Sequence, residues 1–225
     1  MEILRDFKLT LGVEDVLRGE GLIPEIISEK KPGLMKAALQ ALKEGLTSIQ
    51  PAALIQTVRV IDHRHERIFL EGGKDFSNSL VAHHLAGAEQ VTFAVCTIGP
   101  ELEALVTIKM KDESILGLAL DGLGNAAVEA VTQQVCSRIG EEARASGLTA
   151  STPLSPGEPE WSVEQGHIDI FSHLDPSLLG ITFTSGGMMI PRKSISFVMG
   201  VGREMSQTGP CERCSIRERC LHRHV

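Results

Sequence analysis

The sequence contains no tyrosine, one tryptophan and seven phenylalanines, so aromatic residues make up only 4% of its 225 residues. Proteins that bind single-stranded nucleic acid stack the bases on aromatic side chains, which are scarce in this chain. A formal net charge of −7 also removes any general attraction to phosphate backbones or to anionic membranes. The composition therefore predicts neither nucleic acid nor membrane as a partner.

The sequence also lacks long uninterrupted apolar segments. Residues 1–6 do not resemble the apolar core of a signal peptide, and no apolar run reaches the length of a transmembrane helix. The sequence thus predicts a cytoplasmic protein. A hydrophobic content of 42% and a charged content of 23% are typical of a globular chain, and the length allows a sizeable core.

Familiar catalytic and nucleotide-binding motifs are missing. The chain has no P-loop pattern and no Gly-x-Ser-x-Gly pattern. Gly200 and Gly202 form a Gly-x-Gly without the third glycine of a dinucleotide site, so they do not predict one. No acid pair and no Ser/His/Asp set stands out, and we assign no catalytic residue.

Strand-like and helix-like patterns alternate without a regular βαβ rhythm, which favours an α+β fold. The predicted strands cover residues 7–11, 56–62, 67–71, 90–96, 181–184 and 194–199. Between them, Asp75 or Ser77 is the predicted cap of a helix that carries His83 and His84, which we expect at the surface with metal binding as a remote alternative.

The longest helical pattern runs from residue 113 to residue 145 and is interrupted by three glycines: Gly117, Gly122 and Gly124. Glycines inside a helix usually allow another backbone or a ligand to come close. A break into two helices explains them equally well.

The chain is organised around residues 155–165, which contain the only tryptophan. Pro156 and Gly157 predict a turn, because proline fixes φ at about −65° and glycine readily takes a positive φ. Ser162 and Gln165 then match a capping box at a helix start. Backbone N–H groups at such a place can bind an anion or a carboxylate. The alternative is a plain turn and helix cap, with Trp161 in the core.

The chain has five cysteines, and an odd number argues against a closed disulfide framework. Three of them crowd into the last fifteen residues: Cys211, Cys214 and Cys220. With His222 or His224 they match a Cys3His zinc site, whereas three thiolates and one further ligand match an iron–sulfur cluster. A reduced tail without metal is the third alternative. We predict a folded domain over residues 1–205 and a metal-binding tail over residues 206–225.

Three motifs together resemble the activation domain of vitamin B12-dependent methionine synthase, and in particular the stand-alone members of that family. They are Thr97-Ile98-Gly99-Pro100, the Ser155-Pro156-Gly157 turn with Trp161 and Gln165, and Met188-Met189-x-Pro191-x-Lys193-Ser194-x-Ser196. The resemblance extends in order over residues 1–205. Several stand-alone members also end in a C-x2-C and a later cysteine.

The resemblance implies an α+β fold with a central twisted antiparallel sheet and packed helices. It implies an accessory protein that binds S-adenosylmethionine as methyl donor for the reductive activation of a cobalamin-dependent enzyme. The cobalamin would be carried by a corrinoid-binding methyltransferase or methionine synthase subunit, with an electron donor protein as a further partner. The implied cofactor-binding residues are Ser155, Pro156, Gly157, Glu158, Trp161, Gln165 and Lys193.

The sequence departs from the family at two positions of the turn. Similar stand-alone members read Arg-x-Ser-Pro-Gly-Tyr, whereas here Pro153 stands in place of the arginine and Glu158 in place of the tyrosine. The arginine would pair with the carboxylate of the ligand, and losing such a pair weakens binding by roughly 2–4 kcal/mol. Lys193 or Arg192 is then the substitute cation. The second hypothesis is a non-catalytic corrinoid-protein partner or assembly factor with a degenerate site and a structural zinc tail.

Overall fold

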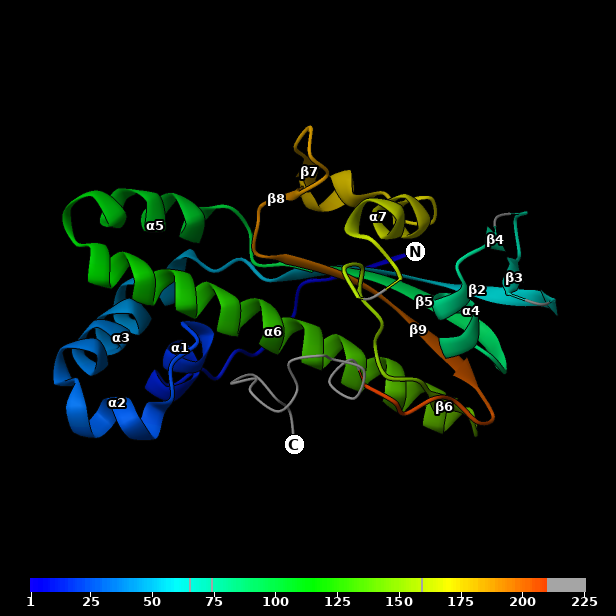
Figure 1. Ribbon diagram of the computed structural model, residues 1–225, viewed down its shortest axis with the longest axis horizontal. Helices are drawn as coiled ribbons and strands as arrows, with labels where there is room; N and C mark the ends of the chain where they lie inside the picture. Colours follow the sequence, from blue (N-terminus) through cyan, green and yellow to red (C-terminus); the bar gives the residue numbers. More distant parts are fainter. Residues whose placement is uncertain (65, 74, 159, 210–225) are drawn as a thin grey trace.

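The computed structural model describes residues 1–225 except 65, 74, 159 and 210–225 (Figure 1). The elements follow one another as β1 (Glu2–Leu4), α1 (Val13–Gly19), α2 (Pro24–Lys30), α3 (Pro32–Gly45), the 3-10 helix η1 (Leu46–Ser48), β2 (Ala52–Arg64), β3 (Arg67–Leu70), β4 (Asp75–Phe76), α4 (Ser79–His84), β5 (Ala88–Thr97), α5 (Glu101–Asp112), α6 (Ser114–Ala145), β6 (Thr149–Ala150), α7 (Val163–Phe171), the 3-10 helix η2 (Pro176–Leu179), β7 (Thr182–Phe183), β8 (Met189–Ile190) and β9 (Ser194–Gly202).

An antiparallel sheet of seven strands lies at the centre of the described part of the chain. Its order is β4-β3-β2-β5-β9-β6, and β1 pairs with β2. The three long strands β2, β5 and β9 form the middle of the sheet. Their side chains are buried on both faces over residues 52–55 of β2, residues 91–97 of β5 and most of β9, whereas the second half of β2 is largely exposed. A separate two-stranded hairpin of β7 and β8 precedes β9.

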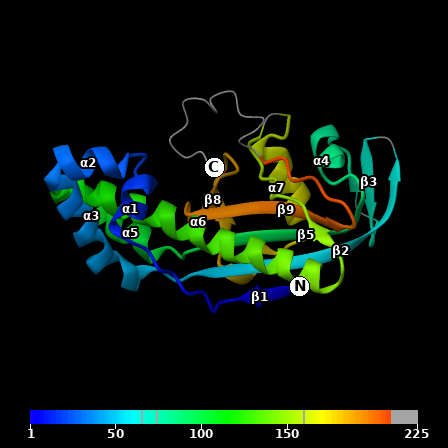
Figure 2. The same ribbon diagram turned by 90° about the horizontal axis from the view of Figure 1, so that it is seen from below.

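Each face of the sheet has its own hydrophobic core, because successive residues of a strand point to opposite faces. On one face, Ala94 and Phe197 belong to the core that contains α6, α1, α3 and α5. On the other face, Phe93 and Val198 belong to a core with α4, Trp161 and α7. Figure 2 shows the sheet lying between α6 and α7.

The 32-residue helix α6 connects the two halves of the molecule (Figure 1). Its N-terminal half packs against α1, α3 and α5, and its C-terminal half lies on the sheet. The helix is unbroken, so its glycines do not mark a break but allow neighbouring segments to come close. A Cβ on Gly122, for example, would lie 2.7 Å from the carbonyl oxygen of Val16. The backbones of α1 and α6 therefore touch at Gly19 and Gly122.

The predicted α+β fold with a central antiparallel sheet is confirmed, and the strands of the sheet core lie where the sequence predicts them. The strand predicted at residues 7–11 is wrong. These residues run extended along α6 and not along the sheet, since Phe7 and Leu9 pack on the α6 core and the carbonyl of Lys8 accepts a hydrogen bond from the Gln134 side chain at 3.1 Å.

Within the described ranges, α6 is also the one helix long and apolar enough to cross a membrane. Of the window that passes this test, 61% is buried inside the protein. Its apolar residues pack on the sheet and on α1, α3 and α5, which accounts for the composition without a membrane.

Candidate functional site

The predicted turn lies beside the open edge of β9. Leu154 forms a β-bridge with Val198, and the chain then leaves the sheet at Ser155. Gly157 has a φ of +100°, which confirms the positive φ predicted for this glycine. The turn closes on itself, because the Gly157 N–H donates to the Trp161 carbonyl at 2.9 Å and the Trp161 N–H donates to the Glu158 carbonyl at 3.0 Å.

Helix α7 begins at Val163 with Ser162 as its cap, as the sequence predicts, but only half of the capping box forms. The Ser162 hydroxyl accepts a hydrogen bond from the Gln165 N–H at 3.2 Å. The side chain of Gln165 does not return to the cap. It donates instead to the Asp169 carboxylate at 2.8 Å, one helical turn further along.

Trp161 lies in the core, as the plain interpretation of this segment states, with 0% of its surface exposed. Its indole N–H donates to the Asp169 carboxylate at 2.9 Å, and its ring meets that of Phe76 edge-on at 6.4 Å. The turn packs tightly on α7, because a Cβ on Gly166 would lie 2.5 Å from the Pro156 ring. Trp161 therefore packs in the core beneath the turn and has no exposed surface there for a ligand to contact.

Helix α4 and its cap contact the chain at Glu160 in the turn and at Thr152 before it, which the sequence did not reveal. At its start, the cap is Asn78 and not Asp75 or Ser77, and the Asn78 amide also donates to the Glu160 carbonyl at 2.7 Å. At its end, the His84 ring N–H donates to the Thr152 carbonyl at 2.9 Å. The prediction of a surface position is wrong for His84, which is only 2% exposed. These contacts join residues far apart in the chain, so no local pattern indicates them.

Lys193 lies away from the turn. Its ammonium group contacts Asp121 at 2.8 Å and Asn125 at 2.7 Å, both on α6. Lys193 is also five residues before Val198, the partner of Leu154, which corresponds to about 16 Å along a strand. The structure therefore brings together residues 155–165 but does not add Lys193 to them.

Three backbone donors of the turn, those of Ser155, Gly157 and Trp161, have partners within the turn, and binding of an anion or a carboxylate here stays a prediction. The Ser155 N–H donates to the carboxylate of Glu158 at 3.5 Å, a long hydrogen bond within the turn. Residues 146–191 include no lysine or arginine but five acidic residues: Glu158, Glu160, Glu164, Asp169 and Asp175. The Asp and Glu side chains of residues 146–191 are thus not balanced by a lysine or arginine of the same segment.

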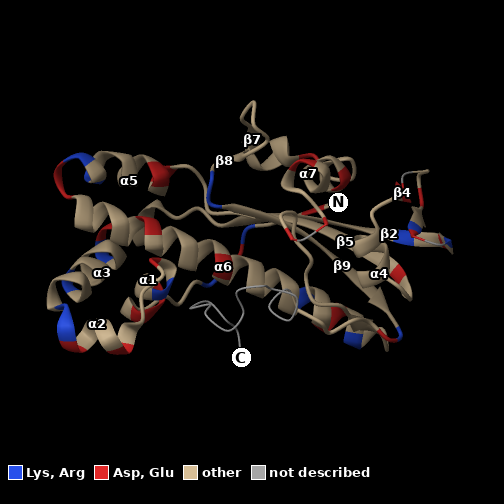
Figure 3. Ribbon diagram, viewed as in Figure 1, with Lys and Arg blue, Asp and Glu red and all other residues tan. Residues whose placement is uncertain are grey.

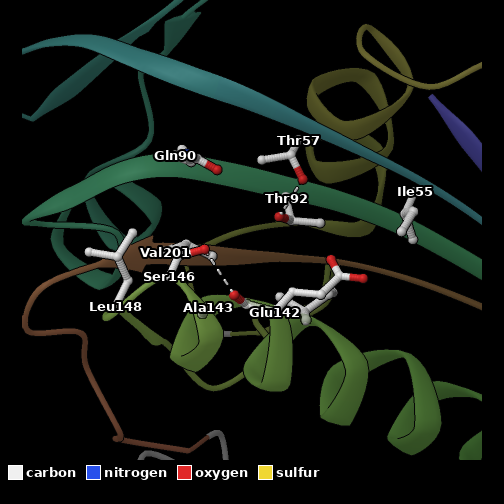
Figure 4. A pocket seen from close by; sticks show the side chains of 10 residues that line it. Ile55, Thr57, Gln90, Thr92, Glu142, Ala143, Ser146, Leu148 and Val201 are labelled. Carbon is white, nitrogen blue, oxygen red and sulfur yellow. Dashed lines mark hydrogen bonds between the residues drawn. The ribbon is translucent and has the colours of Figure 1, made fainter.

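A pocket of about 200 Å³ lies on the opposite face of the sheet, beneath the C-terminal half of α6 (Figure 4). It is lined by Ile55, Thr57, Gln90, Thr92, Ile139, Glu142, Ala143, Ser146, Leu148 and Val201. The Thr57 and Thr92 hydroxyls are 2.9 Å apart on its floor. No residue of the predicted site lines this pocket, and its hydroxyl, amide and carboxylate groups include no cation.

The predicted metal ligands Cys211, Cys214, Cys220 and His222 lie outside the described residues. Among the residues that the structure does describe, no group of three His, Cys, Asp or Glu side chains is placed to hold a metal ion. Cys96 and Cys136 pack between the sheet and α6, and burial raises the pKa of each thiol to about 12. Both are therefore protonated and poor metal ligands or nucleophiles at neutral pH.

Comparison with solved structures identifies the fold. A crystal structure of the MetH reactivation domain bound to AdoHcy superimposes with a TM-score of 0.65 and covers 88% of this chain and 78% of that chain, at 12% sequence identity. This chain has the fold of the MetH reactivation domain. No protein-family model and no curated protein matches the sequence. The resemblance inferred from the motifs thus agrees with the MetH reactivation fold, and the agreement extends over most of both chains.

Proposed function

We propose that this protein is an accessory protein for the reductive activation of a corrinoid-dependent methyltransferase. The observation that carries the proposal is the shared fold with the MetH reactivation domain over 88% of the chain, in a structure that contains AdoHcy. The motifs of the sequence support the same function, because the resemblance they carry is to an activation domain of this kind.

In this proposal, the methyl donor is S-adenosylmethionine and the cobalamin is carried by a separate corrinoid-binding protein. The methyl group would pass from the sulfonium to the cobalt of the partner after an electron donor protein had reduced that cobalt, and S-adenosylhomocysteine would be released. The chain itself then has to bind and orient the donor without proton chemistry, which agrees with the absence of any assigned acid, base or nucleophile. The donor would lie at the turn formed by Ser155, Pro156, Gly157 and Glu158.

The acidic turn fits only part of such a ligand. Glu158, Glu160 and Glu164 suit the positive sulfonium, whereas residues 146–191 offer no lysine or arginine to the ligand carboxylate. The contacts of Lys193 with Asp121 and Asn125 favour the second hypothesis, a non-catalytic partner of a corrinoid protein with a degenerate site. Binding of the donor is what separates the two hypotheses.

The test is calorimetric titration of the full-length, anaerobically purified protein with S-adenosylmethionine. We expect micromolar binding that Gly157→Ala weakens at least tenfold, because alanine strains a turn with a φ of +100°. Gly147→Ala is the matched control, since Gly147 also has a positive φ, of +72°, but lies at the end of α6. Absence of binding at millimolar ligand would exclude methyl donation and leave the partner hypothesis.

We also propose that residues 206–225 form a metal-binding tail joined to the domain of residues 1–205. The support is the spacing of Cys211, Cys214 and Cys220, with His222 as a further ligand. A brown chromophore with stoichiometric iron in anaerobic protein would identify a redox cluster, whereas colourless protein with one zinc per chain would identify a structural site. Protein without bound metal, whether native or reconstituted, would refute the tail proposal.

A further inference from the structure

The face of the sheet beneath α6 changes from apolar to polar at the pocket shown in Figure 4. Along β5 this face carries the core residues Cys96 and Ala94, because alternate residues of a strand share a face. It then carries Thr92 and Gln90, and Thr57 of β2 lies directly opposite Thr92. Only 2% of the surface of Thr92 is exposed, so a hydroxyl group occupies a buried position between the sheet and the helix.

These polar groups have hydrogen-bonding capacity that the described residues do not use. The Thr57 and Thr92 hydroxyls share one hydrogen bond of 2.9 Å, which engages one of their two protons. Among the residues that the structure describes, the other hydroxyl proton has no acceptor and the Gln90 carboxamide has no partner. The strands thus present to the pocket one O–H donor together with the N–H donors and the carbonyl acceptor of an amide.

The charges around the pocket favour a neutral ligand. Its lining residues include no lysine or arginine, and burying a carboxylate without an opposite charge is costly. The Glu142 carboxylate on the helix side already accepts a hydrogen bond from Arg138 at 2.7 Å, so its charge is compensated without a cationic ligand. Figure 3 shows basic and acidic residues near one another along the C-terminal half of α6, which covers the pocket.

We propose that this pocket is a binding site for a small uncharged carboxamide whose apolar part is a single ring or a short chain. A volume of about 200 Å³ suits a molecule of this size, since a cavity of about 150 Å³ holds benzene. The ligand amide pairs with the Gln90 carboxamide through complementary N–H···O hydrogen bonds, and the remaining proton of the Thr57–Thr92 pair supplies a further donor. The apolar part meets the aliphatic side chains of the lining. This site lies away from the turn at residues 155–158 and goes beyond the proposed function.

The experiment titrates the full-length, isotope-labelled protein with benzamide and follows the backbone amide chemical shifts by NMR. We expect saturable binding with a dissociation constant of about 1 mM or lower, and the largest shift changes at the residues that line the pocket. Benzoate has the same ring with a carboxylate in place of the amide. We expect it to bind about tenfold more weakly or worse, because the pocket offers its charge no partner.

Three variants locate the binding. Thr92→Val keeps the shape of the side chain and removes the hydroxyl, so we expect it to weaken benzamide binding about fivefold. Ala143→Leu fills the pocket from the helix side and should abolish binding. Thr107→Val is the matched control, because it removes an exposed threonine hydroxyl on α5, outside the pocket, and should leave the affinity unchanged.

Three results would each overturn the inference: shifts that do not saturate with benzamide, equal affinity for benzoate and benzamide, or binding that Thr92→Val and Ala143→Leu both leave unchanged. The amide spectrum itself verifies that each variant is folded. If Ala143→Leu does not fold, Thr92→Val decides, because it preserves the volume of the side chain. None of these results bears on the proposed function, since binding of S-adenosylmethionine is measured separately.

Discussion

Glu20 is a carboxyl group placed where its charge is unfavourable. It follows α1 directly, against Gly122 of α6, and one of its carboxylate oxygens is buried with no hydrogen-bond partner among the described residues. Burial raises the pKa of Glu20 from 4.5 to about 7. The folded protein therefore binds this proton more tightly than the unfolded chain does.

We expect this carboxyl to make stability depend on pH. Because its folded pKa is raised, its stabilising contribution is complete below pH 4.5 and is lost as the pH rises to about 7. Glu20→Gln should remove that loss and raise the free energy of unfolding at pH 8 by about 1–2 kcal/mol, a value reduced for partial exposure. Urea titrations from pH 5 to pH 8 measure it, with the exposed Glu25→Gln as control. Parallel pH profiles for Glu20→Gln and the native protein would refute the assignment.

Asp169 accepts hydrogen bonds from the Trp161 indole and the Gln165 amide and so joins the turn to α7. Asp169→Ala would leave the buried indole N–H of Trp161 without its acceptor, which costs about 1–3 kcal/mol. We expect a lower melting temperature and a changed emission spectrum, which Trp161 alone provides because the chain has no other tryptophan. Glu164→Ala on the exposed side of α7 should change neither. A native spectrum and melting temperature for Asp169→Ala would show that the hydrogen bond contributes nothing.

At the scale of the elements, α6 offers two glycines in contrasting positions. A Cβ on Gly122 meets the Val16 carbonyl at 2.7 Å, whereas a Cβ on Gly140 has no atom within 4 Å. We expect Gly122→Ala to destabilise the protein by about 2 kcal/mol or more, since α1 has to move away. Gly140→Ala should stabilise it by about 0.5–1 kcal/mol through helix propensity. Thermal unfolding of both variants measures the difference, and equal effects would mean that the α1–α6 contact is loose.

The sequence predicted those features of the fold that depend only on residues near one another in the chain. The period of α6, the buried strand β5 and the Pro156-Gly157 turn each follow from neighbouring residues, so the sequence located them. The contacts that shape the site join distant segments: Asn78 to Glu160, and Lys193 to α6. Pattern alone could not assign these partners, nor decide between a broken helix and a close approach at Gly122. Residues 7–11 alternate like a strand because one side packs on α6, and alternation does not identify the surface it packs on.

At the scale of the whole molecule, the two cores share one sheet. Trp161 reports on the face with α7, and far-UV circular dichroism is dominated by α6 and the helices of the other face. Because β2, β5 and β9 contribute side chains to both cores, we expect the two signals to change together in urea. A fluorescence transition at clearly lower urea than the dichroism transition would show that the α7 face unfolds on its own.

The length of α6 has a mechanical consequence. At 1.5 Å per residue, the arm between its crossing with α1 at Gly122 and its end at Ala145 is about 35 Å long. A pivot of about 5° at that crossing would swing the last turn by about 3 Å, an amount comparable to a change of side-chain contacts. That last turn carries Ala143, which lines the pocket beneath the helix. One unbroken helix thus carries both the close contact with α1 at Gly122 and the pocket wall at Ala143, so the size of the pocket depends on how α6 is seated against α1.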